Sequence, residues 1–303
     1  MTRPDVDVVI ATTGQRPGLL AEAVASVTAQ DYDGNVATIV VYDSTDEPAD
    51  PVETVGDLAR SVRWVRSSRR GLPAARNTGV AAGTAPWVAF LDDDDVWFPA
   101  KLDAQMSASG DANLVGSGVE IVDQSGAAIS RAAPIHLVTR RDLLADRIME
   151  LHPSTFLVRR EALLRVGGVD EDIPGGYAED YDLLLRLAAL GPIVCVSEPL
   201  VRVRWTTGSY FFSRWQTIVT ALRYLLAKHP DFVESRRGHA RVLGQIAFAE
   251  AAMGQRRRAL RSALAALRRN PTERRAPLAA AVALRVVSAE RVQAALHRRG
   301  RGI

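Results

Sequence analysis

The sequence contains a single cysteine, Cys195, so no disulfide bond can form within the chain. Proteins with so few cysteines usually work in a reducing compartment. Residues 1–5 lead directly into a strand pattern, without the apolar stretch and small-residue cleavage site of a secretory signal. The weakly charged stretch 276–289 is interrupted by Arg285 and is shorter than the roughly 20 residues that a membrane-spanning helix needs. We therefore expect a cytoplasmic protein.

The sequence also lacks zinc-finger spacing and the aromatic motifs of RNA-binding domains, so no nucleic acid is expected as a partner. The net charge of +3 conceals an asymmetry. Residues 211–303 carry 19 Lys and Arg against 5 Asp and Glu, which leaves 19 against 30 in residues 1–210. Basic segments attract anionic lipid surfaces or acidic partners. Peripheral contact of residues 211–303 with the inner face of a membrane is therefore an expectation, and a solvated helical surface is the alternative.

Strand and helix patterns alternate along the first two thirds of the chain. The runs that predict strands are 6–11, 36–42, 62–65 and 87–91, and the runs that predict helices are 17–27, 51–60 and 72–83. This alternation predicts βαβ units and a mostly parallel sheet. In such sheets ligands bind beyond the carboxyl ends of the strands. Residues 211–303 have a helical pattern almost throughout.

Four consecutive aspartates, Asp92 to Asp95, follow the apolar run 87–91. Carboxylates packed this closely repel and raise one another's pKa values, so the arrangement is favourable where a cation or several hydrogen-bond donors are held. The pattern indicates a divalent metal site that receives a phosphate-bearing substrate, and a solvated acidic turn is the alternative. In an extended segment, Asp92 and Asp94 would lie on one side and Asp93 and Asp95 on the other.

Five short segments stand in a fixed order within residues 5–210. They are Val8–Thr13, Ile39–Asp46, Gly71–Gly79 with an Ala-Arg-Asn sequence, Leu91–Asp95 with an Asp-X-Asp pattern, and the pair Glu179-Asp180. In this order they resemble glycosyltransferase family 2, whose members are inverting sugar transferases with a GT-A fold. The resemblance implies an α/β domain over residues 1–210, Rossmann-like, with helices on both faces of a mostly parallel sheet. A basic α-helical region, residues 211–303, would follow it.

The resemblance implies transfer of a sugar from a UDP- or dTDP-linked donor to a hydroxyl acceptor. The acceptor would be a glycan, a lipid-linked molecule or a small molecule in the synthesis of cell-surface polysaccharide, glycolipid or natural-product glycans. Mg²⁺ or Mn²⁺ would bridge the phosphate oxygens of the donor. Asp94 would be the main metal ligand and Asp92 would lie nearer the ribose while also serving the metal, with help from Asp95. Asp93 is expected to be replaceable.

Further roles for the donor site follow from the same resemblance. Thr12 and Asp43 would contact the base, and Arg76 would contact the base or a phosphate. Without the resemblance, Asp43 would be read as a turn residue and Arg76 as a surface residue in an ion pair. Arg204, or alternatively Arg202, would contact the diphosphate, because Thr206 stands where family members often carry a histidine.

Inversion at the anomeric carbon needs a general base that removes the proton of the acceptor hydroxyl. Asp180 is the candidate, and Glu179 would orient the acceptor beside it. A carboxylate in the first turn of a helix also stabilises the helix dipole, which is the structural alternative. His152 precedes Pro153-Ser154, where contact with the acceptor is one interpretation and a structural hydrogen bond is the other.

The C-terminal region contains a pattern typical of one tetratricopeptide-like helical hairpin. Its helices would cover 245–253 and 258–267, with Gly254 at the turn and Pro271 beyond the end. Two other functions compete with sugar transfer. One is a nucleotidyltransferase that makes sugar nucleotides, although residues 12–16 are a poor glycine-rich phosphate loop. The other is a catalytically silent scaffold that binds partners through its helical tail.

Overall fold

The computed structural model describes residues 3–43, 59–123, 125–205 and 214–297. By their contacts, the described residues form two compact units. The first consists of the described residues within 1–140, 148–171 and 179–206, and the second of the described residues within 141–147, 172–178 and 207–303. Residues 51–58 of the helix predicted over 51–60, Thr206 and the predicted domain boundary at residue 210 lie outside the described residues. The predicted end of that helix was wrong, because Arg60 begins a strand.

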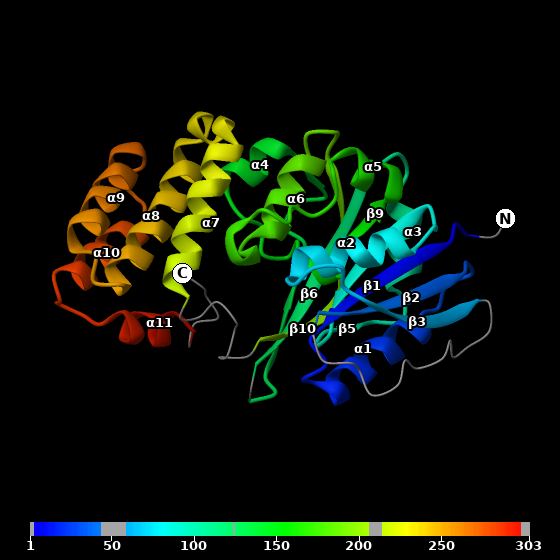
Figure 1. The fold of residues 1–303 in the computed structure, drawn as a ribbon. Coiled ribbons are helices and arrows are strands. Elements are labelled where there is room, and N and C mark those ends of the chain that lie inside the picture. The colour runs from blue at the N-terminus through cyan, green and yellow to red at the C-terminus, as the bar shows by residue number, and fades with distance from the viewer. Residues whose placement is uncertain (1–2, 44–58, 124, 206–213, 298–303) are drawn as a thin grey trace. The chain divides into compact units, whose positions relative to one another are not determined.

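A ten-stranded mixed sheet forms the centre of the first unit. Its strands are β1 Val6–Thr12, β2 Val36–Tyr42, β3 Arg60–Arg66, β4 Trp87–Asp92, β5 Val96–Trp97, β6 Leu114–Asp123, β7 Ala128–Arg131, β8 Leu137–Val138, β9 Leu157–Arg159 and β10 Ile193–Trp205. Along the main path their order is β3-β2-β1-β4-β9-β6-β10-β5. Strands β1 to β4 are parallel, whereas β9 runs antiparallel to both β4 and β6. The strands predicted in the first 91 residues and the α/β class are confirmed (Figure 1).

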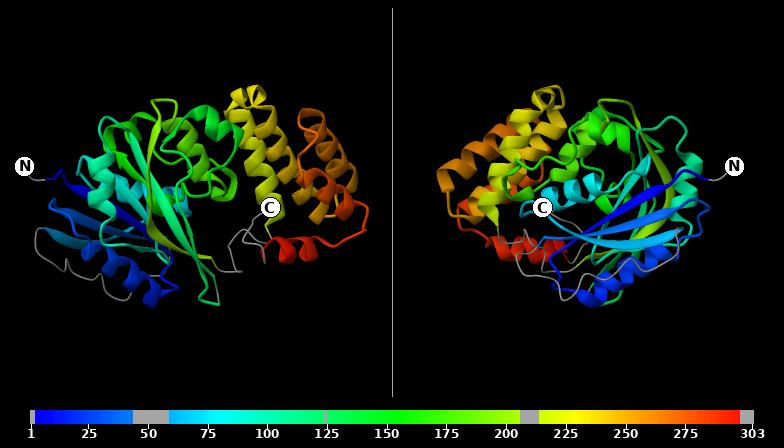
Figure 2. Two further views of the ribbon diagram at one scale, coloured as in Figure 1. Left: turned by 180° about the vertical axis from the view of Figure 1, so that it is seen from behind. Right: turned by 45° about the vertical axis from the view of Figure 1, so that its right-hand side comes forward.

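Helices cover both faces of the parallel half of the sheet. Those of the first unit are α1 Pro17–Thr28, α2 Leu72–Ala82, α3 Lys101–Ala108, α5 Arg160–Arg165 and α6 Glu179–Leu187, with the 3₁₀ turn η1 Pro153–Thr155. Val8 and Ile10 of β1 belong to the same buried cluster as Leu20 of α1. Val9 points to the other face, where a Cβ on Gly79 of α2 would lie 2.4 Å from its Cγ1. Only glycine allows α2 to approach the sheet this closely (Figures 1 and 2).

The second unit is helical apart from its connections. It contains α4 Arg140–Ala145, most of which belongs to it, η2 Pro174–Gly176, α7 Trp215–Lys228, η3 Pro230–Glu234, α8 Arg236–Ala252, α9 Arg256–Arg269, α10 Arg275–Ala283 and α11 Ala289–His297. Its core is rich in alanine, which lets α8, α9 and α10 pack side by side (Figure 2). Gly254, with φ of 73°, makes the turn between α8 and α9, so the predicted helical hairpin is confirmed. Among the described helices, none has the length and apolar character required to cross a bilayer.

Candidate functional site

Thr12 and Asp43 lie at the carboxyl ends of the neighbouring strands β1 and β2. The main-chain N–H of Asp43 donates to the carbonyl oxygen of Thr12 at 2.7 Å. Both carboxylate oxygens of Asp43 accept the N–H of Gly71, at 3.0 and 2.9 Å. Gly71 has φ of 111°, a conformation that favours glycine, and it immediately precedes α2. Asp43 is therefore held at the sheet edge, and its half-buried carboxylate keeps lone pairs for a further donor.

The aspartate run is a turn and not an extended segment. Strand β4 ends at Asp92, and the N–H of Asp95 donates to the carbonyl oxygen of Asp92 at 3.1 Å. This turn removes the alternation expected of an extended chain. Asp92 and Asp95 consequently approach the same group of side chains, while Asp93 and Asp94 approach a different one.

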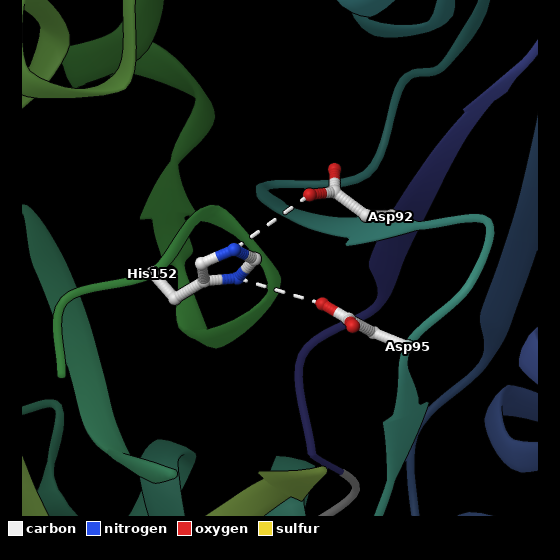
Figure 3. Close-up of side chains that lie close together, drawn as sticks. All are labelled: Asp92, Asp95 and His152. Atoms are coloured by element: carbon white, nitrogen blue, oxygen red, sulfur yellow. Dashed lines mark ion pairs between the residues drawn. The ribbon is translucent and has the colours of Figure 1, made fainter. Parts of the chain in front are cut away.

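Asp92, Asp95 and His152 form a compact cluster. Oδ2 of Asp92 is 3.9 Å from Nε2 of His152, and Oδ2 of Asp95 is 3.5 Å from Nδ1 of the same ring. Figure 3 shows the imidazole lying between the two carboxylates, with one ring nitrogen toward each. One ligand atom from each residue lies within 4.8 Å of the others. The two carboxylates are the oxygen ligands that Mn²⁺ and Mg²⁺ prefer, and the imidazole adds a nitrogen ligand of the kind that transition metals take. The residues present therefore fit a divalent cation, and they fit Mn²⁺ better than Mg²⁺.

Ser154 fixes this cluster to the neighbouring strands. Its hydroxyl donates to Oδ2 of Asp95 at 2.6 Å and accepts the N–H of Asp92 at 3.1 Å. Its carbonyl oxygen accepts the indole N–H of Trp97 at 2.8 Å. Burial, together with the charges of Asp92 and Asp94, raises the pKa of Asp95 well above its ordinary value. The cluster therefore concentrates negative charge in a place that a cation would stabilise.

The other two aspartates of the run bind the loop that follows β1. The hydroxyl of Thr12 donates to Oδ2 of Asp93 at 2.6 Å and accepts the N–H of Gly14 at 3.0 Å. The guanidinium of Arg16 forms ion pairs with both Asp93 and Asp94. Burial raises the pKa of Asp94, as do its aspartate neighbours, and Arg16 opposes the rise. Asp93, expected to be replaceable, is buried and forms part of the framework of this loop.

Arg76 joins the cluster to the carboxylates at the start of α6. Its Nη2 donates to Oδ1 of Asp92 at 2.7 Å and its Nη1 donates to Oε1 of Glu179 at 2.6 Å. The Arg76 side chain is only 4% exposed, and its guanidinium lies over the ring of Phe90. Burial alone would raise the pKa of Asp92, but Arg76 and His152 outweigh that effect and hold it below its usual value. Asp180, which follows Glu179, is also buried.

We expect Arg76→Met to lower the free energy of unfolding by roughly 3 kcal/mol, because it leaves two carboxylates without their shared buried cation. Urea unfolding followed by circular dichroism would measure the change. The control is Arg69→Met, because Arg69 pairs with Glu171 at 3.1 Å but is 67% exposed, and a surface pair contributes less than about 1 kcal/mol. Equal losses of stability in the two variants would contradict the importance of the buried bridge.

Glu179 is an unusual acid in this site. Burial, reinforced by the charge of Asp180, raises the pKa of Glu179 to about 7, against the opposing effect of Arg76. The folded protein thus holds a proton at Glu179 at pH values where the unfolded chain has released it. Glu179 and Asp180 are adjacent in the chain and both are buried. A buried carboxylate with a raised pKa beside a second carboxylate is a feature found at many active sites.

We expect stability to fall as the pH rises from about 4.5 to about 7, because the folded state binds more protons than the unfolded state in this window. The slope from one such group reaches at most about 1.4 kcal/mol per pH unit. Glu179→Gln should flatten this part of the curve of unfolding free energy against pH. Glu161→Gln, at an exposed position in α5, is the control and should keep the wild-type slope. A Glu179→Gln curve parallel to wild type would contradict the assignment.

Arg204 reaches the site through its backbone. Its N–H donates to Oδ1 of Asp95 at 3.1 Å, while its guanidinium pairs with Glu22 of α1. The structure thus brings together Asp92, Arg76 and Glu179 from the predicted site residues, together with Asp180 next in the chain. Asp94 and Thr12 belong to the adjoining group around Arg16 and Asp93, and Asp43 is held separately by Gly71.

Three contributors to the site were not identified by motif. No role was predicted for Arg16 or Ser154, and His152 was interpreted as contacting the acceptor or as making a structural hydrogen bond. The usable signal was the sequence His-Pro-Ser shortly before β9, because polar residues that flank a buried strand often lie at a site. This signal points to the site only because β9 lies beside β4, and no local pattern predicts that pairing.

Comparison with known proteins identifies the family to which this chain belongs. The family model described as "Glycosyltransferase like family 2" matches residues 8–229, which include most of β1, all of β2 to β10 and every predicted site residue. The chain belongs to this family, and the resemblance seen in its motifs is confirmed. 

Characterised and uncharacterised relatives share the same region. The chain is 32% identical over 191 residues to succinoglycan biosynthesis protein ExoU of Rhizobium meliloti (strain 1021), covering 57% of this chain and 54% of that protein. It is also 32% identical over 195 residues to an uncharacterized glycosyltransferase of Nostoc sp. (strain PCC 7120), covering 61% of this chain and 60% of the relative. The chain spans about half the length of these two curated relatives or slightly more.

Solved structures share the fold. The crystal structure of residues 1–349 of S. aureus TarS superposes with a TM-score of 0.59 at 15% identity, covering 98% of this chain and 92% of that chain. The same protein in complex with UDP-GlcNAc gives a TM-score of 0.58 at 16% identity, with the same coverage. The predicted GT-A architecture followed by a C-terminal helical region is confirmed.

Proposed function

We propose that this chain is a metal-dependent, inverting glycosyltransferase that moves a sugar from a nucleoside-diphosphate sugar to a hydroxyl acceptor. The observation that carries the proposal is the continuous array of side chains His152, Asp92, Arg76 and Glu179, which ends beside Asp180. It connects a cation-binding cluster to an acid pair through one buried guanidinium. Sugar transfer needs these two functions a short distance apart.

The cation cluster serves the leaving group. Asp92, Asp95 and His152 are the residues assembled to hold Mg²⁺ or Mn²⁺, and Asp94 is the ligand expected from the family resemblance. When bound, the cation stabilises the negative charge that develops on the diphosphate. For Asp94 to join the set, its carboxylate must exchange the Arg16 guanidinium for the cation.

Residues at the ends of β1 and β2 serve the nucleotide. Asp43 accepts a hydrogen bond from a base N–H, and the Gly71 N–H holds its carboxylate in place for this role. Thr12 supports the adjoining loop through its contact with Asp93. Arg76 orients Asp92 toward the ribose and the cation, and Arg204 contributes positive charge near the diphosphate once it leaves Glu22.

The acid pair serves the acceptor. Asp180 takes the proton of the acceptor hydroxyl as the hydroxyl oxygen forms a bond to the anomeric carbon, and the bond from that carbon to the diphosphate breaks on the opposite face. Glu179, protonated below about pH 7, donates a hydrogen bond that orients the acceptor beside Asp180. The positive charge of Arg76 partly offsets the repulsion between the carboxylates of Glu179 and Asp180.

The donor class proposed is UDP- or dTDP-linked, and the acceptor class is a glycan, a lipid-linked molecule or a small molecule. The complex of TarS with UDP-GlcNAc and the succinoglycan role in the name of ExoU support a uridine donor and polysaccharide synthesis. We propose a cytoplasmic place of work with peripheral contact at the inner membrane face. The single cysteine, buried at position 195, is consistent with a reducing compartment.

A panel of nucleoside-diphosphate sugars tests the proposal directly. The wild-type protein with Mn²⁺ should release nucleoside diphosphate from at least one donor, by hydrolysis or by transfer to an added acceptor. Release should be absent with Asp94→Ala. No turnover of any donor would favour the scaffold alternative, and release of pyrophosphate from a nucleoside triphosphate with a sugar phosphate would favour the nucleotidyltransferase.

A further inference from the structure

Helix α9 has an unusual composition for a helix at the surface of a protein. Of its 14 residues, Arg256 to Arg269, six are arginine and none is acidic. Within the described residues, no ion pair joins any of these arginines to a carboxylate. Helices at protein surfaces usually mix both signs of charge and gain from pairs one turn apart. The charge of α9 is therefore left for a partner outside the helix.

One face of α9 accounts for its place in the fold. Ala259, Ala263 and Ala266 recur at four- and three-residue spacing and are almost fully buried. They belong to the same cluster as Phe248 of α8 and Ala279 of α10. Packing within the second unit thus uses the alanine face together with the partly buried Leu267. Leu260 and Leu264 do not belong to that cluster.

The opposite face combines apolar and cationic side chains. Leu260 is 38% exposed and Leu264 is 49% exposed, so both leave much of their apolar surface in water. Arg257, Arg261 and Arg268 are also exposed, and their spacing places them on the same stripe of the helix. We call these five residues the outer face of α9. A single exposed leucine is ordinary, but two within one purely cationic stripe need an explanation.

We infer that the outer face of α9 is a contact surface for a bilayer that contains anionic lipid. Arginines alongside exposed leucines on one helical face are the pattern of a helix that lies in the interface of a membrane, with its apolar side chains among the acyl chains and its cations at the head groups. Charge complementarity selects an anionic surface. The leucines select a lipid over a nucleic acid, because phosphates and sugars offer no apolar surface to them.

This surface is independent of the proposed sugar transfer, since no residue of the proposed site belongs to α9 or to the second unit. A lipid-binding measurement therefore succeeds or fails without reference to catalysis. Binding would place the enzyme beside lipid-linked acceptors, but the measurement does not need an acceptor.

Flotation of the full chain with phosphatidylcholine vesicles, with and without phosphatidylglycerol, tests the inference. At low salt, the wild-type protein should float with the anionic vesicles and not with the neutral ones, and added salt should weaken the binding. Arg257→Gln/Arg261→Gln/Arg268→Gln should weaken partitioning about 100-fold, at roughly fivefold per charge. Leu260→Ser/Leu264→Ser should weaken it by about tenfold or more, because the insertion of apolar side chains is lost.

Matched controls remove the same groups elsewhere. Arg141→Gln/Arg165→Gln/Arg291→Gln loses the same charge at exposed positions outside α9, and Leu164→Ser/Val233→Ser loses two exposed apolar side chains. Both controls should bind as wild type, and circular dichroism should show that every variant keeps its helices. The inference is overturned by wild-type protein that does not float at low salt, or by controls that lose as much binding as the α9 variants. It is also overturned if the leucine variant binds anionic vesicles like wild type. Binding of a single-stranded oligonucleotide as tight as binding of the vesicles, and unchanged in the leucine variant, would overturn it as well.

Discussion

Asp180→Asn should lower the rate of sugar transfer by about 10²- to 10⁴-fold, the range that a positioned general base contributes. Asparagine matches the size of aspartate but cannot accept the proton of the acceptor hydroxyl. The amide also removes one negative charge beside Glu179, whose raised pKa depends partly on Asp180. Binding of UDP or dTDP should remain close to wild type, since Asp43, Thr12 and the cation cluster are untouched.

The measurement pairs steady-state transfer with calorimetric titration of the nucleotide. Asp111→Asn, at an exposed position remote in sequence from every motif, is the control for loss of one carboxylate and should keep wild-type activity. Near-normal turnover by Asp180→Asn would remove Asp180 from the mechanism. Loss of both nucleotide binding and transfer would indicate that Asp180 supports the structure of the site instead.

His152→Ala should weaken binding of Mn²⁺ by about 100-fold if the cluster of Asp92, Asp95 and His152 is the cation site. Replacing a residue that only hydrogen-bonds to a metal ligand lowers metal affinity by about 10- to 100-fold. We expect the upper end of this range because His152 would itself supply a ligand atom. His152 is about one third exposed, and its Nδ1 accepts the N–H of Ser154 at 3.4 Å, so circular dichroism should accompany the measurement to show that the variant is folded. Electron paramagnetic resonance of Mn²⁺ measures the affinity without any catalytic turnover.

Two further variants distinguish a cation site at Asp92, Asp95 and His152 from one in which Asp94 is the main ligand, as expected from the sequence. His136→Ala removes an exposed histidine of the same unit and should bind Mn²⁺ as wild type. If the cluster holds the ion in the absence of donor, Asp94→Asn should weaken Mn²⁺ binding less than His152→Ala does. If Asp94 is the main ligand, Asp94→Asn should weaken Mn²⁺ binding more. Wild-type affinity in His152→Ala together with a large loss in Asp94→Asn would decide for the motif over the cluster.

The motifs and their order could be found without a structure because they are local. A strand followed by Asp43, an Ala-Arg-Asn helix start at Arg76, and carboxylates at Asp92 and Glu179 are each defined by a few adjacent residues. Since successive parallel strands bring their carboxyl ends to one edge of a sheet, the approximate location of the site followed from the strand pattern. The helical hairpin of α8 and α9 was likewise predicted from a local pattern, with Gly254 at the turn and Pro271 beyond the second helix.

The pairing of side chains within the site could not be predicted in this way. Alternation grouped Asp92 with Asp94 because it assumed an extended chain, whereas a hydrogen bond from Asp95 to Asp92 makes the segment a turn. Arg76 was expected to contact the donor, and its link to Glu179, 103 residues away in sequence, has no local signal. The prominence of His152 depends on the antiparallel placement of β9 against β4.

By itself, the sequence determined the family, the alternation of strands and helices in the first 91 residues, the acidic end of β4 and the strongly basic helix α9, because each depends on residues that are neighbours in the chain. Only the tertiary structure decided which carboxylates share a histidine, which two acids share Arg76 and which face of α9 is left exposed. These outcomes depend on contacts between segments that are far apart in sequence, where packing and burial set both the geometry and the pKa values.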